Sequence, residues 1–507
     1  MKLNRTQNTI RNVAWGGTNK IVSILLPFIV KTVIINVLGI DYLGLSNLFA
    51  SIISMLNITE LGFSSAMLFS MYKPLADDDT ETICALLNYY RKVYRIMGCI
   101  VLLLGLGLLP FLPYLINGSY PADINIYILY LIYLAKDVLG FFLFAYKGTI
   151  LVLHQRQDII SRIRIVLVSA QYVIQIIILV ILKNYYLYLI ILPIITIVDN
   201  ILNAYFATKI YPQYVCRGKL TLDTKRKIKI SVGGLSISGA SGLICNTMDN
   251  IIISAFLGLS SVAIYGNYRY VMTAVHACMI VIIDAMRAGV GNSVASENEE
   301  KNYQNMRQII FIYMWVTGIC SVCLFTLYQS FMRLWVGNEL LLPISTVILE
   351  VLHFFALCIG DIERLYCDTV GYWWKQKKKY ILESVLNLGL NIILVQIWGV
   401  NGVIFASVIS ALIVNLSIGI PNMHKYYFKS ISCKSEYCAY LYHFCTMLIA
   451  SGICYWICQY IPEGVFGILR KGIISFFVTN ILFVILFSKS KYIKIFPNLI
   501  KKYVLVK

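Results

Sequence analysis

The sequence predicts an all-α polytopic membrane protein with about 14 transmembrane helices. Of its 507 residues, 59% are hydrophobic and only 13% are charged, and the mean hydropathy is +0.76. This composition excludes a soluble multidomain protein. Apolar runs of about 20 residues or more, the length that crosses a bilayer, recur along the whole chain. The predicted spans lie near residues 13–38, 42–71, 94–116, 124–151, 160–182, 185–208, 230–257, 262–286, 308–336, 343–372, 380–398, 402–423, 438–460 and 465–487.

The distribution of basic residues predicts the orientation of these spans. The first run is too long for a signal-peptide core and has no small-residue cleavage site after it, so we expect it to be a true span. Most of the 43 lysines and arginines fall in alternate connections, which places both termini in the cytoplasm of a bacterial cell. We therefore interpret the net charge of +19 as positive-inside bias and contact with anionic lipids, and we expect no nucleic-acid partner.

A glycine pattern indicates an internal duplication. The arrangement GG…G over residues 16–39 returns over residues 233–258, six predicted spans later, so both copies have the same orientation. We predict a six-helix bundle over residues 1–215 and a second over 216–430, related by pseudo-two-fold symmetry. Residues 431–507 would add a helix pair and a basic cytoplasmic tail. Such a plan is typical of transporters that bind substrate between the halves, near the midplane of the membrane.

The first predicted span carries two lysines, Lys20 and Lys31. By insertion scales, each costs roughly 2.5 to 3.5 kcal/mol near the middle of a membrane helix. Eleven residues amount to about 20° beyond three turns, so both ammonium groups lie on one helix face about 16 Å apart. The face either lines a water-filled cavity or lets both side chains snorkel toward the two interfaces.

Further spans carry charged residues at helical spacing. Lys136 and Lys147 share a face of the fourth run, although Lys136 adjoins Asp137 and can pair with it. The eighth and tenth runs carry polar stripes. The stripe of the tenth run is open to two interpretations: ion pairs that hold the bundle, or transport roles. In the eighth run, Arg269 lies near the outer end of its span and either serves transport or snorkels toward the interface. The stripe residues are Arg269, His276, Asp284 and Arg287, then Glu350, His353, Asp361, Arg364 and Asp368.

Asp249 lies in the middle of the seventh run, beside Asn250. A buried carboxylate among amide and hydroxyl oxygens suits a sodium ion or a proton relay. The alternative is pairing with a lysine or arginine of the cavity. Asn387 and Asn391, one turn apart on the eleventh run, are candidates to complete an ion site.

The sequence predicts no cofactor other than a coupling Na⁺ or H⁺. Its 14 cysteines are scattered, and the one close pair, Cys320 and Cys323, is more simply explained by helix packing, so we expect neither a metal site nor a disulfide. There is no GxxxxGK[ST] phosphate loop. The run Asp77-Asp78-Asp79 precedes a predicted helix, where acidic residues favour the positive end of the helix dipole, so we do not expect catalysis there.

Five segments, in order and spacing, resemble the bacterial Wzx-type polysaccharide flippases of the multidrug/oligosaccharidyl-lipid/polysaccharide exporter superfamily. The segments are NTIRNVAWGGTNKIVSILLPFIVKTVIINVLGIDYLGLSNLFASIISMLNITELGF, YKPLADDDTETI, AYKGTILVLHQRQDII, MDNIIISAFLGLSSVAIYGNY and NLGLNIILVQIWGVNGVIFASVIS. The resemblance implies two six-helix halves, usually with two extra helices, around a cationic cavity. It also implies that an undecaprenyl-diphosphate-linked oligosaccharide is moved from the cytoplasmic to the outer leaflet.

The resemblance suggests roles for single residues. Substrate-binding basic residues of the family would correspond to Lys20, Lys31 and Arg269, and Asp249 would be the ion-coupling acid. The stripes add Lys147 and Arg364 as substrate-binding candidates. We expect a monomer among membrane lipids, with a polysaccharide polymerase and glycosyltransferases as candidate protein partners.

Two other functions compete with this interpretation. An ion-coupled drug or small-molecule exporter of the same superfamily predicts an acidic cavity, whereas the lone charges of the first and fourth runs are basic. A membrane enzyme that transfers or polymerises sugars usually needs a large outer loop, and the longest predicted outer loop has only about ten residues. We therefore expect a transporter and not an enzyme.

Overall fold

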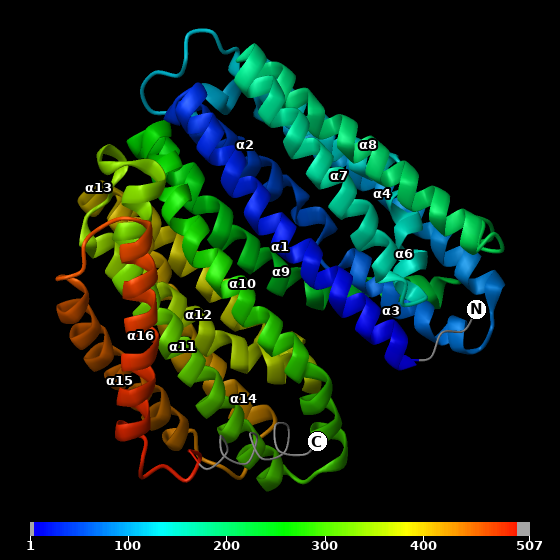
Figure 1. Cartoon of the computed structure of the whole chain (residues 1–507). Helices are drawn as coiled ribbons and strands as arrows, with labels where there is room; N and C mark the ends of the chain where they lie inside the picture. Colours follow the sequence, from blue (N-terminus) through cyan, green and yellow to red (C-terminus); the bar gives the residue numbers. More distant parts are fainter. Residues whose placement is uncertain (1–4, 494–507) are drawn as a thin grey trace. The chain divides into compact units, whose positions relative to one another are not determined.

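The computed structural model describes residues 5–493, which form helices and connecting loops without a strand (Figure 1). In chain order the α-helices are α1 (Arg5–Val37), α2 (Ile40–Leu56), α3 (Phe63–Ala76), α4 (Thr80–Leu108), α5 (Ile126–Phe142), α6 (Ala145–Leu153), α7 (Gln157–Ile177), α8 (Tyr185–Ile210), α9 (Leu222–Leu257), α10 (Leu259–Ser296), α11 (Glu299–Val336), α12 (Ile344–Val370), α13 (Lys377–Val414), α14 (Ile420–Tyr426), α15 (Lys434–Cys458) and α16 (Val465–Leu486). The predicted all-α membrane class is confirmed.

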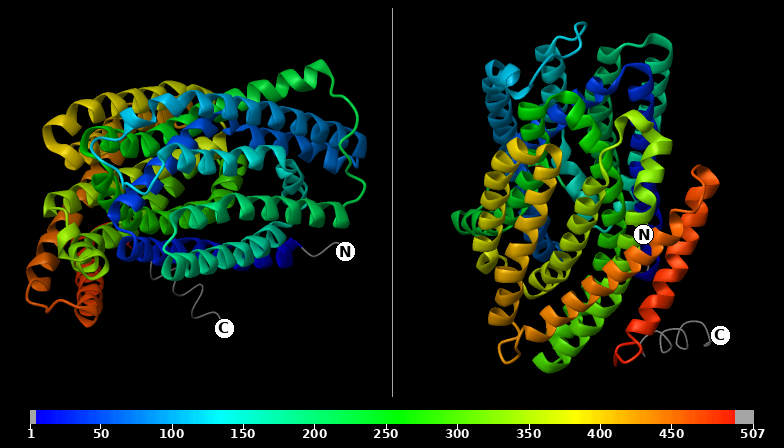
Figure 2. Two further views of the ribbon diagram at one scale, coloured as in Figure 1. Left: turned by 90° about the horizontal axis from the view of Figure 1, so that it is seen from above. Right: turned by 90° about the vertical axis from the view of Figure 1, so that its left-hand side faces the viewer.

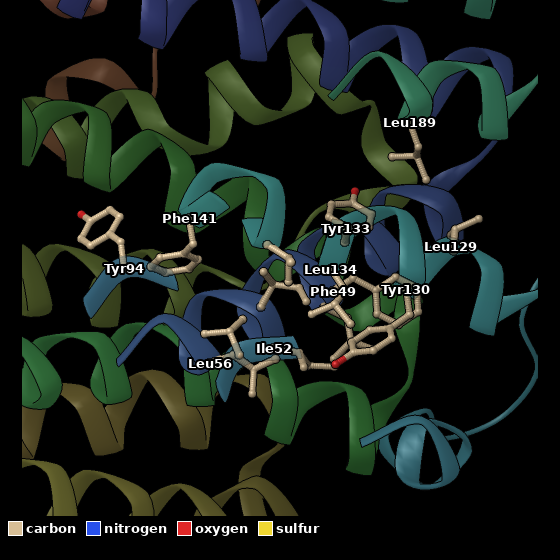
Figure 3. Packing of buried hydrophobic residues seen from close by; sticks show 14 of the residues in the cluster. Phe49, Ile52, Leu56, Tyr94, Leu129, Tyr130, Tyr133, Leu134, Phe141 and Leu189 are labelled. Carbon is tan, nitrogen blue, oxygen red and sulfur yellow. The ribbon is translucent and has the colours of Figure 1, made fainter. Parts of the chain in front are cut away.

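The chain forms two compact units, one up to Ala263 and one from Ile264 onward. In the first unit, α1 packs on α7, α5 packs on α8, and α7 runs beside α8 (Figure 1). Its core is apolar and aromatic: the ring of Phe49 on α2 lies 5.9 Å from that of Tyr130 and 6.0 Å from that of Tyr133, both on α5 (Figure 3). In the second unit, α15 and α16, orange to red in Figure 2, form a hairpin that packs on α11.

Helix α9 belongs to the first unit, where it packs on α2 and α3. Gly44 of α2 permits close approach to the first residue of α10, because a Cβ atom there would lie 2.3 Å from the carbonyl oxygen of Leu259. The boundary between the compact units therefore lies after α9, whereas the predicted six-helix bundles divide between residues 215 and 216. The two bundles were predicted from a duplication in the sequence, and the division into bundles stays a prediction.

Eleven helices of the described chain are long and apolar enough to cross a membrane, or twelve if the pair α5 and α6, bent by 55°, is one span. The predicted count of 14 is therefore not confirmed. Part of the difference arises in α13, which reverses at Gly399 (φ 58°, ψ −136°). The side chain of Asn387 donates to Ser407 Oγ at 3.1 Å, although a straight helix would hold the two residues about 30 Å apart. Two predicted spans thus lie in one element.

The second predicted span, near residues 42–71, is interrupted. A short 3₁₀ turn, Asn57–Glu60, separates α2 from α3, and Gly62 (φ 77°) starts the second helix. The polar residues of this turn break the apolar run.

The acidic run before α4 caps that helix. The Asp79 carboxylate accepts a hydrogen bond from the backbone N–H of Thr82 at 2.9 Å. Hydrogen bonds from Thr82 hold the pKa of Asp79 below its usual value, as expected for a helix cap.

Candidate functional site

Helix α1 is continuous through both predicted lysines, with Pro27 inside it. The predicted geometry therefore applies: Lys20 and Lys31 lie on one helix face, about 16 Å apart. The side chain of Lys20 is exposed and that of Lys31 is half-buried. Residues 5–37 contain no aspartate or glutamate, so the helix itself supplies no countercharge. The helix is held to α7, where the Arg162 guanidinium lies 4.5 Å from the ring of Trp15.

The lysines of α5 and α6 contact side chains of the first unit. Lys136 Nζ lies 3.5 Å from the carboxylate of its neighbour Asp137, which confirms the simpler of the two predicted arrangements. Lys147 Nζ donates to Thr208 Oγ1 of α8 at 2.8 Å and lies 5.9 Å from the ring of Phe144. Lys147 thus links α6 to α8 through a neutral hydroxyl, and its role in substrate binding stays a prediction.

A polar cavity of about 340 Å³ lies inside the first unit. It contains three carboxylates and two cations together with amides, so it is not a simple anion site. Its polar lining residues are Asn57, Glu60, Tyr94, Lys136, Asp137, Arg164, Gln171, Thr196, Asp199 and Asn200. Most were not predicted, because they come from helices far apart in the sequence. One available signal was Asp199, a lone carboxylate within the apolar run 185–208.

In the second unit, polar and charged side chains join α10 to α12 in three rungs. The first rung is Arg269, whose Nη1 lies 3.4 Å from Glu350 Oε2 and also contacts His353 Nδ1. The middle rung is His276 Nε2 with Asp361 Oδ2 at 2.9 Å.

The last rung is Arg287, whose Nη2 lies 3.2 Å from Asp368 Oδ2 and 3.1 Å from Asp284 Oδ1. The paired residues follow the same order along both helices, so α10 and α12 run parallel. Of the two interpretations of the tenth-run stripe, ion pairing is thus present. A transport role for Arg269 stays a prediction, as does one for Arg364, whose side chain is exposed on α12.

The predicted ion-coupling residues divide between the two units. Asp249 is fully buried on α9, and the side chain of its neighbour Asn250 donates to Ser51 Oγ of α2 at 2.8 Å. Asn391 donates to Asn387 Oδ1 at 3.3 Å, and Asn387 donates to Ser407, so these amides fasten the two arms of α13 together. That Asn387 and Asn391 complete an ion site with Asp249 stays a prediction.

The fold is that of known membrane transporters. It is similar to the lipid II flippase MurJ in an inward closed conformation, with a TM-score of 0.66, 14% identity, and coverage of 95% of this chain and 99% of that chain. It is also similar to an inward-facing multidrug resistance MATE family transporter of the MOP superfamily, with a TM-score of 0.61, 14% identity, and coverage of 79% and 94%.

A third similar structure is a MOP superfamily transporter from Pyrococcus furiosus, with a TM-score of 0.54, 13% identity, and coverage of 81% of this chain and 93% of that chain. No curated protein matches the sequence. The model of one protein family, described as polysaccharide biosynthesis protein, matches residues 9–287, which is more than half of the chain. The chain, a multi-span membrane protein with the fold of these transporters, belongs to the polysaccharide biosynthesis protein family.

Proposed function

We propose that this protein flips undecaprenyl-diphosphate-linked oligosaccharide repeat units from the cytoplasmic to the outer leaflet by alternating access, for surface polysaccharide assembly. The observation that supports this most is the pair of lysines on one face of α1, at two depths, in a helix without a carboxylate. Membership in the polysaccharide biosynthesis family and the fold shared with a lipid flippase agree with it.

The chemistry of the substrate explains why two separated ammonium groups are useful. A diphosphate that crosses the bilayer needs countercharges along its path, and charge-assisted hydrogen bonds to phosphate oxygens supply them. Because lysine is a point charge on a flexible stem, it can release the diphosphate more readily than a bidentate arginine clamp would. Two such groups about 16 Å apart allow the headgroup to pass from one to the other.

The proposal also covers the location of the protein in the cell and the energy source for transport. The protein would lie in the bacterial cytoplasmic membrane as a monomer with both termini in the cytoplasm, near a polysaccharide polymerase and glycosyltransferases. A Na⁺ or H⁺ gradient would drive transport, with no other cofactor. The three-rung ladder balances its arginines with carboxylates, so we assign to substrate Arg364, an exposed cation of α12 outside the ladder.

A deletion strain tests the class of substrate. Mass spectrometry of undecaprenyl-linked lipids should show accumulation of one completed oligosaccharide diphosphate lipid relative to the parent strain, and a plasmid copy of the gene should remove it. If no lipid accumulates and sensitivity to drugs rises instead, the protein is a small-molecule exporter of the same fold. That outcome would leave the two lysines of α1 without a function.

The buried Asp249 gives a separate prediction about coupling. Transport of the labelled lipid into proteoliposomes by the Asp249→Asn variant should lose its dependence on an imposed Na⁺ or H⁺ gradient, because the amide cannot bind a proton or balance a bound cation. Asp284→Asn, at an exposed carboxylate of α10, is the matched control. If the variant keeps the gradient response of the wild type, Asp249 has a structural role.

A further inference from the structure

The middle rung of the ladder contains a third side chain besides its hydrogen-bonded pair. The Sγ atom of Cys358, the Nε2 side of His276 and the carboxylate of Asp361 present ligand atoms that all lie within 4.8 Å of one another. We propose that these three residues form a binding site for a thiophilic divalent cation of the zinc class. The site is independent of the proposed transport function, because it rests on the ligand atoms alone.

The positions of the three side chains fit such an ion. Zinc binds sulfur at about 2.3 Å and nitrogen or oxygen at about 2.0 to 2.2 Å, so the ligand atoms of a tetrahedral site lie about 3.3 to 3.6 Å from one another. The three ligand atoms lie within 4.8 Å of one another, so they would move together by at most about 1 Å to hold the ion. Cys358 and Asp361 are three residues apart on α12 and so share a face, and His276 meets them from α10. The ion would replace the hydrogen bond between His276 and Asp361.

A residue of a third helix already orients the carboxylate. The Tyr313 hydroxyl of α11 donates to Asp361 Oδ2 at 2.8 Å. Hydrogen bonds of this kind orient metal ligands, and their loss typically lowers metal affinity by about 10- to 100-fold. Three protein ligands leave the fourth position of a tetrahedral site to a water molecule or to the Tyr313 oxygen.

The donor set selects the class of ion. Thiolate and imidazole favour Zn²⁺, Co²⁺ and Cu²⁺, whereas Na⁺, Mg²⁺ and Ca²⁺ require oxygen ligands. The site is therefore distinct in chemistry from any Na⁺ site that drives transport. Cys358 and Asp361 are buried and the His276 side chain is 18% exposed, so the ion would enter past the imidazole.

The arginines of the ladder do not oppose a cation here, whereas Arg364, three residues from Asp361 on α12, lies outside the ladder and adds a positive charge near the site. On α10 the site lies between Arg269 and Arg287, and each of these guanidinium groups is paired with a carboxylate of α12. Their positive charge is thus balanced before the ion arrives. A bound ion would join α10 to α12 by coordinate bonds at the middle rung, and we expect it to raise the melting temperature of the protein.

Cobalt binding to the purified full chain in detergent tests the site, with a purification tag that contains no histidine. Co²⁺ should produce a thiolate-to-cobalt charge-transfer band at one equivalent per chain, and Zn²⁺ should abolish the band by displacement. Cys358→Ser should remove the band, and His276→Gln should weaken Co²⁺ binding by at least tenfold. Cys367→Ser, at another buried cysteine of α12, should bind as the wild type does.

Three results would overturn the proposal. The first is a wild-type protein without the band. The second is a band that persists in Cys358→Ser, which would place the metal at other cysteines. The third is a His276→Gln variant that binds Co²⁺ with wild-type affinity. This variant tests the site even if Cys358→Ser does not fold.

Discussion

Replacing Lys31 with glutamine is expected to lower export of the polysaccharide by about 10- to 100-fold while the amount of protein in the membrane stays at the wild-type level. Hydrogen bonds to a charged group contribute about 1.5 to 3 kcal/mol, and each 1.4 kcal/mol is about a tenfold effect. The same loss is expected for Lys20→Gln. Surface polysaccharide and immunoblots of membrane fractions, measured in the same cultures, report export and abundance.

Two kinds of control variant separate the charge from its position. Arginine at either position keeps the positive charge and should retain a part of the export. Lys183→Gln removes an exposed lysine from the loop between α7 and α8 and should leave export unchanged. Normal export by both Lys20→Gln and Lys31→Gln would remove these residues from the mechanism and with them the main support for an anionic substrate.

Local patterns in the sequence were sufficient for the fold class and for the geometry of α1. Apolar runs of membrane length occur helix by helix, and a spacing of eleven residues sets a shared face in any continuous helix. The break between the eleventh and twelfth predicted spans also coincides with the reversal at Gly399. The interruption at Asn57–Glu60 was missed, because four turn residues inside an apolar run barely change its average hydropathy.

Contacts between distant residues could not be predicted in the same way. The stripe on α12 was evident from its spacing, but the spacing does not say that Glu350 meets Arg269 and that Asp361 meets His276. The cavity of the first unit likewise brings Arg164 of α7 beside α8 residues. The three candidate metal ligands were not predicted to lie together, because the whole of α11 separates His276 from Cys358 in the sequence.

The pair Arg269–Glu350 should have the largest effect on stability. Arg269→Met leaves the fully buried carboxylate of Glu350 without this cation, and breaking a buried ion pair typically costs about 3 to 5 kcal/mol. Glu350→Gln should destabilise less, because the Arg269 side chain is 13% exposed and reaches some water. Denaturant-induced unfolding of the purified variants in detergent measures the loss.

The double variant Arg269→Met/Glu350→Gln distinguishes the structural role of Arg269 from its predicted role in substrate binding. Removing both charges of a buried pair is often neutral, so the double variant should recover most of the lost unfolding free energy. If Arg269 only holds α10 to α12, export recovers together with stability. If Arg269 also contacts the diphosphate, the refolded double variant stays defective in export, because methionine cannot donate to phosphate. We expect the first outcome, since Glu350 already balances the charge of Arg269. A stable double variant without export would show that Arg269 binds substrate as well.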